Sequence, residues 1–331
     1  MTDNSRYEIL IASTTFEGID KAYKVLNTDD FKLTKKDKKE RENWSKENLI
    51  DEVKGKDGII VGGEYDIDDK IIQASDKLKV ISLNCNGYNH VNVKAASRKK
   101  IAVTNTPGVN NNEVANYIMG QILALVRHIV RANQVIRDGK WVTEDINCSI
   151  GLKDSTLGLI GMGSIGQQVA QRAMCFDMRV IANVRHPSAE RAKKFNVEFV
   201  SKDEIYKNAD IVALCCPLTD STRGLIGEKE LKMMKNKSYL VNSMRGPIIK
   251  KKALYKALKN NWIAGAALDV FDEEPLLESK FFELDNVILT PHIAGLVESS
   301  IEAAAVLAAE NLKNVLLYND CENIVNKGFF D

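Results

Sequence analysis

The chain has few of the residues that build disulfide-stabilised or metal-binding proteins. It contains six cysteines and four histidines in 331 residues, and no two cysteines form a CxxC pair. The cysteines are scattered, and no histidine stands at ligand spacing from one, so neither a disulfide framework nor a zinc site is predicted. We therefore expect reduced thiols, no bound metal and a cytoplasmic protein.

Long apolar runs and charge of one sign are also absent. The longest apolar stretch, YIMGQILALV, is too short and too interrupted to span a bilayer. The N-terminal residues MTDNSRYEILIAS lack the basic, apolar and small-residue order of a signal peptide. Because 46 basic and 45 acidic residues leave a net charge of +1, nothing attracts the chain to nucleic acid or to an anionic membrane.

One lysine-rich segment, residues 31–48, is the main candidate for a basic patch. Acidic residues are interspersed in it, which is typical of a solvated surface, and the same interpretation holds for Lys250–Lys252, which open a helical pattern. An apolar content of 44% with 27% charged residues is that of a soluble globular protein. The length fits two domains of ordinary size.

Short apolar runs alternate with amphipathic stretches along the chain, which predicts an α/β protein with parallel sheets. A helix over residues 112–136, about 37 Å long, would bridge two units and offer a surface to a second subunit. A final Ala-rich helix over 297–318 can pack back on the first unit. Strands are expected in two series, at 7–13, 58–63, 79–85 and 101–105, and then at 155–160, 179–184, 209–216, 238–243, 265–271 and 286–291.

The segment TLGLIGMGSIGQQ contains the pattern GxGxxG between an apolar strand and a helical pattern. In that setting Gly161 permits a tight turn, Gly163 lacks the Cβ that would block a pyrophosphate, and Gly166 lets helix and strand approach. Backbone N–H groups near Ser164 and Ile165 would face the phosphates at the start of the helix. The segment therefore predicts a dinucleotide-binding site.

The next strand, RVIANV, ends where a chain that binds NAD usually has an acidic residue to hold the ribose hydroxyls. Val184 occupies that position, and Arg185 beside it is a planar cation suited to phosphate. Ser188 and Arg191 are candidates to assist it. The pattern favours NADPH, with NAD possible, over the alternative of exposed basic residues and a relaxed choice of cofactor.

Three charged or titratable residues follow strands of the second series. His292 ends the strand NVILTP, Arg245 follows SYLVNS, and Glu274 follows GAALDVF. A reversible conversion between alcohol and ketone needs a proton donor that works near neutral pH, which a histidine supplies. An arginine is the natural partner of a substrate carboxylate, and a carboxylate beside the histidine would favour its protonated form. Each residue alone has a purely structural explanation, but together with the glycine loop they predict a redox site.

Six motifs in this chain resemble those of the D-isomer-specific 2-hydroxyacid dehydrogenases, in the family's order and approximate spacing. They are VTNTPG, TLGLIGMGSIG, CPLTDSTRGLI, VNSMRG, GAALDVFDEEPL and LTPHIAG. The resemblance covers nearly the whole chain and implies an NAD(P)-dependent oxidoreductase. It implies two doubly wound domains, one Rossmann-like and one flavodoxin-like, with the active site in the cleft, and usually a homodimer. The substrate-binding domain would comprise residues 1–101 and 296–331, and the dinucleotide-binding domain residues 102–295.

The family also implies a role for each matching residue. Arg245 would bind the substrate carboxylate, His292 would donate the proton during reduction, and Glu274 would be the partner of His292. Asp269 would hold the nicotinamide carboxamide. The other residues expected along the cofactor are Cys215, Pro217, Thr222, Ser243, Met244, His292 and Gly295, besides Gly161, Gly163, Ser164, Ile165, Gly166, Val184 and Arg185.

The chain departs from the family's pattern at two places. Where many members have a Gly-Val-Gly triplet whose N–H groups hold the substrate carboxylate, this chain has Cys85, Asn86 and Gly87. We expect backbone binding of the substrate to survive, with the side chains of Cys85 and Asn86 reshaping the pocket. The acidic residue missing at Val184 goes with NADPH use in this family.

The resemblance leaves the substrate open. We expect a small 2-oxo acid such as glyoxylate, hydroxypyruvate or pyruvate. D-3-phosphoglycerate dehydrogenase is an alternative, but its substrate phosphate calls for basic groups, and the loop GGEYDIDDK carries Glu64 and Asp66. A second alternative is a dinucleotide-sensing corepressor, because corepressors with this fold can retain the same three residues.

Overall fold

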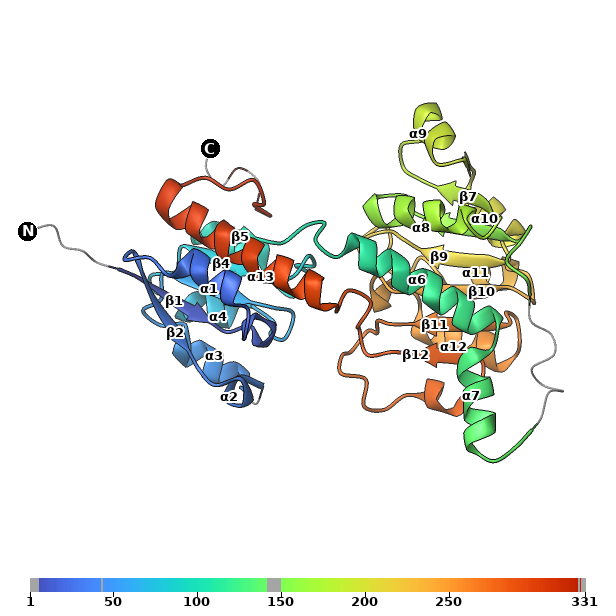
Figure 1. Ribbon diagram of the computed structural model, residues 1–331, viewed down its shortest axis with the longest axis horizontal. Helices are drawn as coiled ribbons and strands as arrows, with labels where there is room; N and C mark the ends of the chain where they lie inside the picture. The colour runs from blue at the N-terminus through green and yellow to red at the C-terminus, as the bar shows by residue number, and fades with distance from the viewer. Residues whose placement is uncertain (1–5, 43, 142–149, 327, 329–331) are drawn as a thin grey trace, which may run out of the picture. The chain divides into compact units, whose positions relative to one another are not determined.

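The computed structural model describes residues 6–42, 44–141, 150–326 and 328 (Figure 1). The chain forms two compact units, one of residues 1–110 with 296–331 and the other of residues 111–295. The first boundary lies nine residues later than the sequence indicates, because strand β5 (Ala102–Thr104) pairs with β4 (Val80–Leu83) in the sheet of the first unit.

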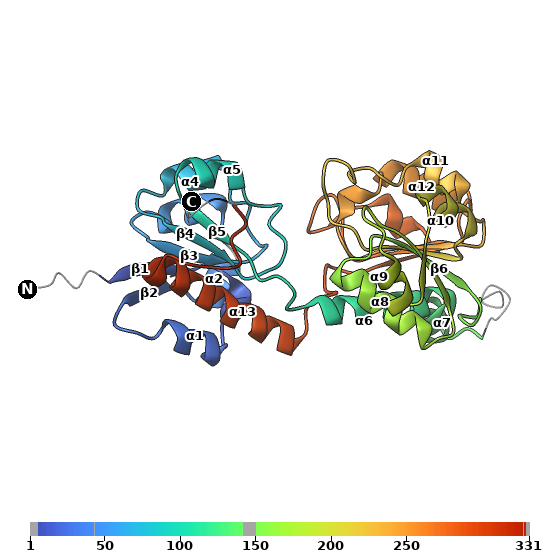
Figure 2. The same cartoon turned by 90° about the horizontal axis from the view of Figure 1, so that it is seen from above.

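The first unit contains a five-stranded parallel sheet in the order β2-β1-β3-β4-β5, which is the flavodoxin-like order. Apolar residues of its strands face two separate cores, one under α1 and α13 and the other under α3, α4 and α5 (Figures 1 and 2). The other strands are β1 (Tyr7–Ile11), β2 (Phe31–Lys35) and β3 (Gly58–Val61), and the helices are α1 (Asp20–Leu26), α2 (Lys38–Glu42), α3 (Lys46–Glu52), α4 (Asp69–Ala74), α5 (Val93–Arg98) and α13 (Glu298–Lys313).

The final helix packs on this unit, which confirms the expectation from the sequence. Ala305, Ala308 and Leu312 of α13 are fully buried against the sheet and α1, and the carbonyl of Ala308 accepts a hydrogen bond from Ser82 Oγ at 2.8 Å. Small alanine side chains let the helix lie close to the strands. A π-helical turn, Asn314–Tyr318, continues α13.

The interpretation of residues 31–48 as a solvated surface is wrong for part of the segment. Its first five residues form the edge strand β2, in which Phe31 is buried while Lys32 Nζ bonds Glu8 Oε1 at 2.7 Å. Arg41 of α2 is 1% exposed, because its guanidinium donates to the Ser13 carbonyl and pairs with the Glu17 carboxylate.

The second unit contains a seven-stranded parallel sheet in the order β12-β11-β10-β9-β6-β7-β8, the Rossmann order extended by one strand. Its strands are β6 (Thr156–Ile160), β7 (Arg179–Asn183), β8 (Val197–Phe199), β9 (Ile211–Leu214), β10 (Tyr239–Asn242), β11 (Gly265–Leu268) and β12 (Val287–Leu289). The prediction of two doubly wound parallel sheets is therefore confirmed. The sequence did not indicate β2 and β8.

Helices cover both faces of this sheet, as Figures 1 and 2 show. Apolar residues of α6 (Asn111–Val126) and α8 (Ser164–Met174) fill the core on one face. The opposite core includes residues of α10 (Lys202–Asn208), α11 (Glu228–Met233) and α12 (Lys251–Lys259), and α9 (Ala189–Lys194) precedes the edge strand β8.

The prediction of one continuous helix over residues 112–136 is wrong. The helix ends at Val126, and α7 (Ile129–Arg137) begins after His128, whose φ is +50°. A left-handed residue breaks the helical hydrogen-bond series, so α7 takes a new direction. None of its residues is buried, and Ile129, Val130 and Ile136 are more than half exposed.

The remaining expectations concern thiols, metals and membranes. Among the described residues, Cys175, Cys215, Cys216 and Cys321 are free thiols, while Cys148 lies outside the described ranges. Within the same ranges no group of three or more His, Cys, Asp or Glu side chains is arranged to hold a metal ion. No helix in the described part of the chain is long and apolar enough to cross a bilayer.

Candidate active site

The glycine loop joins β6 to α8 and requires its glycines for separate reasons. Gly161 has φ +96°, and a Cβ on it would lie 2.6 Å from the Cys215 carbonyl oxygen. A Cβ on Gly166 would lie 2.7 Å from the Gly161 carbonyl oxygen. Both glycines therefore serve packing and turn geometry within the protein.

Gly163 differs, because a Cβ built on it meets no protein atom within 4 Å. It is exposed at the N-cap of α8, where no side chain caps the first-turn N–H groups that begin at Ser164. The open space above Gly163 and the uncapped helix end are what a pyrophosphate needs in order to approach the backbone. The loop therefore fits a dinucleotide.

The residues at the end of β7 and in the following loop have two roles: some are exposed, and others fix the shape of the loop. Val184 packs against the core, whereas Arg185 is exposed and has no hydrogen-bond or ion-pair partner in the described part of the chain. Ser188 caps α9 by accepting from the Arg191 N–H at 3.3 Å, and Arg191 Nη2 donates to the His186 carbonyl at 2.6 Å. Ser188 and Arg191 thus hold the loop that presents Arg185.

The residues expected further along the cofactor follow β9. Cys215 is buried, and burial raises the pKa of its thiol to about 12, with a smaller contribution from Cys216. Thr222 Oγ1 donates to the Pro217 carbonyl at 2.7 Å and accepts from the Thr219 N–H at 2.7 Å, so it closes a turn after Pro217. The Cys215 thiol is therefore neutral and takes no part in acid–base chemistry.

Two loops of the second unit bring His292 and Glu274 together. His292 Nδ1 lies 2.7 Å from Glu274 Oε2, and Glu274 Oε1 accepts the Phe271 N–H at 2.8 Å. Burial raises the pKa of Glu274, but hydrogen bonds from His292 and the Phe271 N–H, with the charge of Arg245, outweigh it and lower the pKa below its usual range. Glu274 is consequently ionised at neutral pH.

Arg245 follows β10 and is half-buried. Asn242 Nδ2 donates to its carbonyl at 2.9 Å, and its own Nη1 donates to the Met244 carbonyl at 2.6 Å. The turn presses closely on the loop after β11, because a Cβ on Gly246 would lie 2.0 Å from the Phe271 carbonyl carbon. This close approach places the loop of Arg245 directly against the loop that leads to Glu274.

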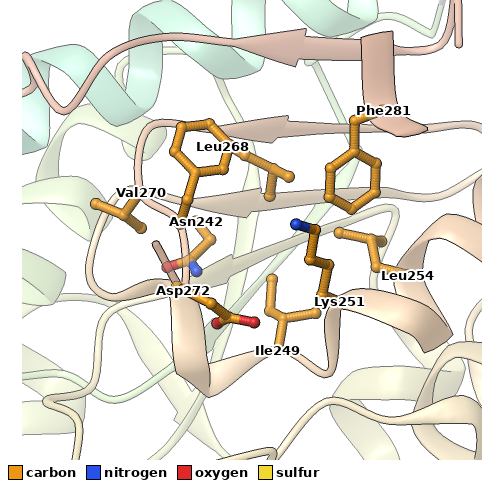
Figure 3. A pocket seen from close by; sticks show the side chains of 10 residues that line it. Asn242, Ile249, Lys251, Leu254, Leu268, Val270, Asp272 and Phe281 are labelled. Carbon is orange, nitrogen blue, oxygen red and sulfur yellow. The ribbon is translucent and has the colours of Figure 1, made fainter. Parts of the chain in front are cut away.

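Two cavities flank these loops. A cavity of about 20 Å³ is lined by Asn242, Gly246, Lys251 and Asp272 among others. Figure 3 shows the side chains of Asn242, Lys251 and Asp272 around it. A larger cavity of about 310 Å³ opens beside His292 and Glu274, with apolar lining from Leu276, Phe282 and Leu289 among others. The first has room for about one water molecule, and the second has the size of a small-molecule site.

Asp269 has a local role that the sequence did not indicate. Its side chain is fully buried and accepts hydrogen bonds from Thr290 Oγ1 at 2.7 Å and from the N–H groups of Ile293 at 3.0 Å and Ala294 at 2.9 Å. Its carbonyl also accepts the His292 N–H at 2.8 Å. Asp269 therefore holds the backbone on both sides of His292, which has φ +53°.

Two residues of α6 also reach these loops, and sequence reasoning missed them. Gln121 is 4% exposed and accepts a hydrogen bond from Ser243 Oγ at 2.6 Å. Tyr117, one turn earlier, lies beside Thr290 and Asp269; burial raises its pKa, opposed by a hydrogen bond with Thr290. The sequence did contain one signal for Gln121, because its polar amide lies among the apolar residues of one helix face.

The expected substrate triplet lies in the first unit, after β4. Cys85 Sγ contacts the Gly87 carbonyl at 3.2 Å, and the Asn86 carbonyl accepts from Asn105 Nδ2 at 2.7 Å. In the same unit Glu64 Oε1 accepts from the Thr14 N–H at 3.0 Å and from Thr14 Oγ1 at 2.8 Å. A carboxylate therefore occupies the polar loop at the carboxyl ends of β1 and β3.

Comparison with known proteins identifies the family. A family model for the NAD binding domain of the D-isomer specific 2-hydroxyacid dehydrogenases matches residues 119–294. The chain belongs to this family. Membership confirms the resemblance of the motifs and makes the chain an NAD(P)-dependent oxidoreductase that acts on 2-oxo acids.

Relatives of this dehydrogenase have related activities. A glyoxylate reductase of Thermococcus litoralis is 37% identical over 84% of this chain and 86% of its own length. A D-3-phosphoglycerate dehydrogenase of Methanocaldococcus jannaschii is 39% identical over 85% of this chain and 54% of its own length. The crystal structure of an NADPH-dependent glyoxylate/hydroxypyruvate reductase of Sinorhizobium meliloti, in complex with NADP and malonate, has a TM-score of 0.80 and 27% identity over 97% of each chain.

Proposed function

We propose that this dehydrogenase reduces glyoxylate or hydroxypyruvate to the D-2-hydroxy acid and prefers NADPH. The hydrogen-bonded pair of His292 and Glu274 carries the proposal, together with the packing of the loop that leads to Glu274 against the Arg245 turn. A proton donor aligned by an ionised carboxylate, next to a cation for the substrate carboxylate, is what the reduction of a 2-oxo acid requires.

The chain's own residues have distinct tasks in this reaction. The nicotinamide cofactor, when bound at the glycine loop, supplies the hydride that reaches the carbonyl carbon. His292 donates a proton to the carbonyl oxygen through Nε2, because its Nδ1 is engaged with Glu274. Glu274 fixes the ring orientation and keeps a negative charge beside it. Arg245 binds the substrate carboxylate and polarises the carbonyl.

The preference for NADPH rests on the end of β7. The Val184 side chain cannot accept hydrogen bonds from ribose hydroxyls. The exposed Arg185 has no partner among the described residues, so its guanidinium is available to a 2′-phosphate. The S. meliloti relative, described as NADPH-dependent, supports this assignment. NADH is expected to be the less favoured cofactor.

The substrate assignment rests on the relatives and on the first unit. Several relatives are glyoxylate reductases, and we propose that backbone N–H groups of Cys85–Gly87 help to bind the substrate carboxylate. Glu64 disfavours the alternative of phosphoglycerate, because its carboxylate, held by the Thr14 N–H and hydroxyl, puts negative charge in a loop where a substrate phosphate calls for basic groups. A domain assignment follows, with substrate recognition in the unit of residues 1–110 and 296–331 and cofactor binding in residues 111–295.

We further propose a cytoplasmic homodimer that binds neither nucleic acid nor a membrane. The exposed Ile129, Val130 and Ile136 of α7 supply an apolar surface on the second unit for a second copy of the chain. A dinucleotide-sensing corepressor is the second candidate, since corepressors of this fold can retain the three site residues.

A turnover assay separates the two candidates. NADPH oxidation is measured with glyoxylate, hydroxypyruvate, pyruvate and phosphohydroxypyruvate, and cofactor binding is measured in parallel. A reductase oxidises NADPH with the first two substrates. Tight cofactor binding without oxidation by any 2-oxo acid would favour the corepressor.

A further inference from the structure

We propose that Gln121 is a positioning residue, which fixes the loops of Arg245 and His292 relative to one another. This inference rests on the proposed function. Gln121 lies on α6, outside every loop that carries a predicted site residue, and its side chain is 4% exposed. Its neighbours on the buried face of the helix, such as Ile118 and Ile122, are apolar core residues. An amide in that position costs stability unless it is fully hydrogen-bonded.

The first contact of Gln121 reaches the loop after β10. Ser243 Oγ donates to Gln121 Oε1 at 2.6 Å, and Ser243 is itself 6% exposed. Ser243 lies two residues before Arg245, in the turn that Asn242 holds through the Arg245 carbonyl and the Met244 N–H. Gln121 thus anchors the start of the turn that presents the guanidinium.

The second contact reaches the loop after β12. Gln121 Nε2 points to Thr290 Oγ1 at 3.5 Å, and Thr290 Oγ1 donates to Asp269 Oδ1 at 2.7 Å. A hydroxyl has only one proton, and Thr290 Oγ1 donates its proton to Asp269. Thr290 Oγ1 can therefore only accept a hydrogen bond from Gln121 Nε2. The carbonyl oxygen and the NH2 group of the Gln121 amide, acceptor and donor, therefore face one loop each.

Asp269 connects Thr290 to the backbone around His292. Its carboxylate accepts the N–H groups of Ile293 and Ala294, and its carbonyl accepts the N–H of His292. His292 has φ +53°, a conformation that costs a non-glycine residue free energy and persists only where its surroundings impose it. The line from Gln121 through Thr290 and Asp269 supplies that restraint from the helix.

Tyr117 strengthens the assignment, because it faces the same pair of residues. It stands four positions before Gln121, which places both side chains on one face of α6, and it lies beside Thr290 and Asp269. Two polar side chains of one helix therefore converge on the support of His292. Their joint placement gives α6 a function beyond covering the sheet.

The test compares Gln121→Met with Ile118→Met, both of which place the same unbranched apolar side chain on the buried face of α6. Ile118 is fully buried in the same core cluster and contacts none of the site loops through a polar atom. We expect Gln121→Met to lower kcat for glyoxylate about 10- to 100-fold, since small misplacements of reacting groups have effects of this size. The dissociation constant of NADPH should change less than about threefold, and Tm should fall as in Ile118→Met.

A double-mutant cycle with Thr290→Val tests whether Gln121 acts through Thr290. If it does, the two substitutions together should lower kcat by less than the product of their separate effects, because residues in one hydrogen-bonded chain are not additive. The part of the loss that comes from the contact with Ser243 should remain. Fully additive effects, or a Gln121→Met enzyme with the kcat of Ile118→Met, would overturn the proposal.

Amide hydrogen exchange of the free protein separates this proposal from the proposed function. Peptides that cover residues 290–294 should exchange faster in Gln121→Met than in Ile118→Met and wild type, whatever the substrate. If exchange is faster in Gln121→Met but the wild type reduces no 2-oxo acid, the positioning role of Gln121 is supported and the proposed reductase function is wrong. If exchange is unchanged in Gln121→Met and the wild type is an active reductase, the positioning role is wrong and the proposed function is supported.

Discussion

His292 Nδ1 lies 2.7 Å from Glu274 Oε2, while Glu274 Oε1 is held by the Phe271 N–H. Both oxygens of the carboxylate are therefore engaged, and the imidazole ring is oriented by one of its two nitrogens. Glu274 has a lowered pKa, so its negative charge is present at neutral pH beside the ring. This pair is the part of the site that an assay can test most directly.

Replacing His292 by Asn should remove most of the reductase activity. Asparagine keeps a polar side chain of similar reach but cannot donate a proton to a developing alkoxide. General acid catalysis contributes about 10²- to 10⁴-fold, so kcat should fall by that factor while NADPH still binds. Steady-state kinetics with a binding titration measures both, and near-normal turnover would exclude His292 as the proton donor.

Glu274→Gln should lower the rate and change its dependence on pH at the acidic end. The pKa of Glu274 lies below its usual range, so in the wild type the carboxylate keeps its charge on acidification until the pH falls below the range of an ordinary glutamate. Glutamine has no charge to lose, and it holds the His292 ring without a charge-assisted hydrogen bond, which is worth about 1.5 to 3 kcal/mol. At neutral pH kcat/KM for glyoxylate should therefore fall about tenfold or more, and the loss of activity that protonation of Glu274 causes at acidic pH should be absent. Initial rates from acidic to neutral pH check both, and a variant with the wild-type rate would contradict the role of Glu274.

Arg245→Lys should raise KM for the 2-oxo acid and lower kcat, although the charge is kept. Lysine cannot form the two parallel hydrogen bonds of a guanidinium with a carboxylate, and kcat/KM should fall about tenfold or more. Arg223→Lys, at an exposed arginine of a neighbouring loop, is the matched control and should behave as wild type. Equal kinetics of the two variants would argue against carboxylate binding by Arg245.

Two alanine substitutions in the glycine loop should distinguish a loss of NADPH affinity from a loss of protein stability. Gly163→Ala adds a Cβ that meets no protein atom, so Tm should stay unchanged while the NADPH affinity falls about tenfold or more. Gly166→Ala places a Cβ 2.7 Å from the Gly161 carbonyl oxygen and should cost about 1 to 3 kcal/mol of stability. Thermal unfolding and a NADPH titration check the two predictions. A destabilised Gly163→Ala would contradict the open space around the Cβ position of Gly163.

Arg185→Ala should weaken catalysis with NADPH but not with NADH. Loss of a charged hydrogen bond of about 1.5 to 3 kcal/mol corresponds to a decrease of about 10- to 150-fold in kcat/KM for NADPH. Lys193→Ala, at an exposed cation of the following helix α9, is the control and should change neither value. An equal loss with both cofactors would show that Arg185 does not contact the 2′-phosphate.

Much of the fold could be predicted because strands of parallel sheets are short apolar runs. All the expected strands are present, and their cores end within a few residues of the predicted limits. β2 and β8 were missed because they are edge strands, in which charged residues such as Lys32 and Glu198 interrupt the apolar pattern. The break at His128 was missed because helical periodicity continues across it.

The candidate site could be predicted only in part. His292, Glu274 and Arg245 were indicated because each follows a strand, and parallel strands end at a common edge of the sheet. The support of His292 by Asp269, Thr290 and Gln121 joins segments up to about 170 residues apart, since Thr290 and Gln121 are separated by 169 positions. Such a connection depends on how α6 packs across the sheet. A local sequence pattern does not predict that packing.

The measurement that tests the central claim most directly is an initial-rate matrix of 2-oxo acids against NADPH and NADH, with wild type and His292→Asn side by side. The account predicts oxidation of NADPH by glyoxylate and hydroxypyruvate in the wild type, slower oxidation of NADH, and loss of both in the variant. If no 2-oxo acid oxidised either cofactor in the wild type, or if the variant matched it, the account would be contradicted.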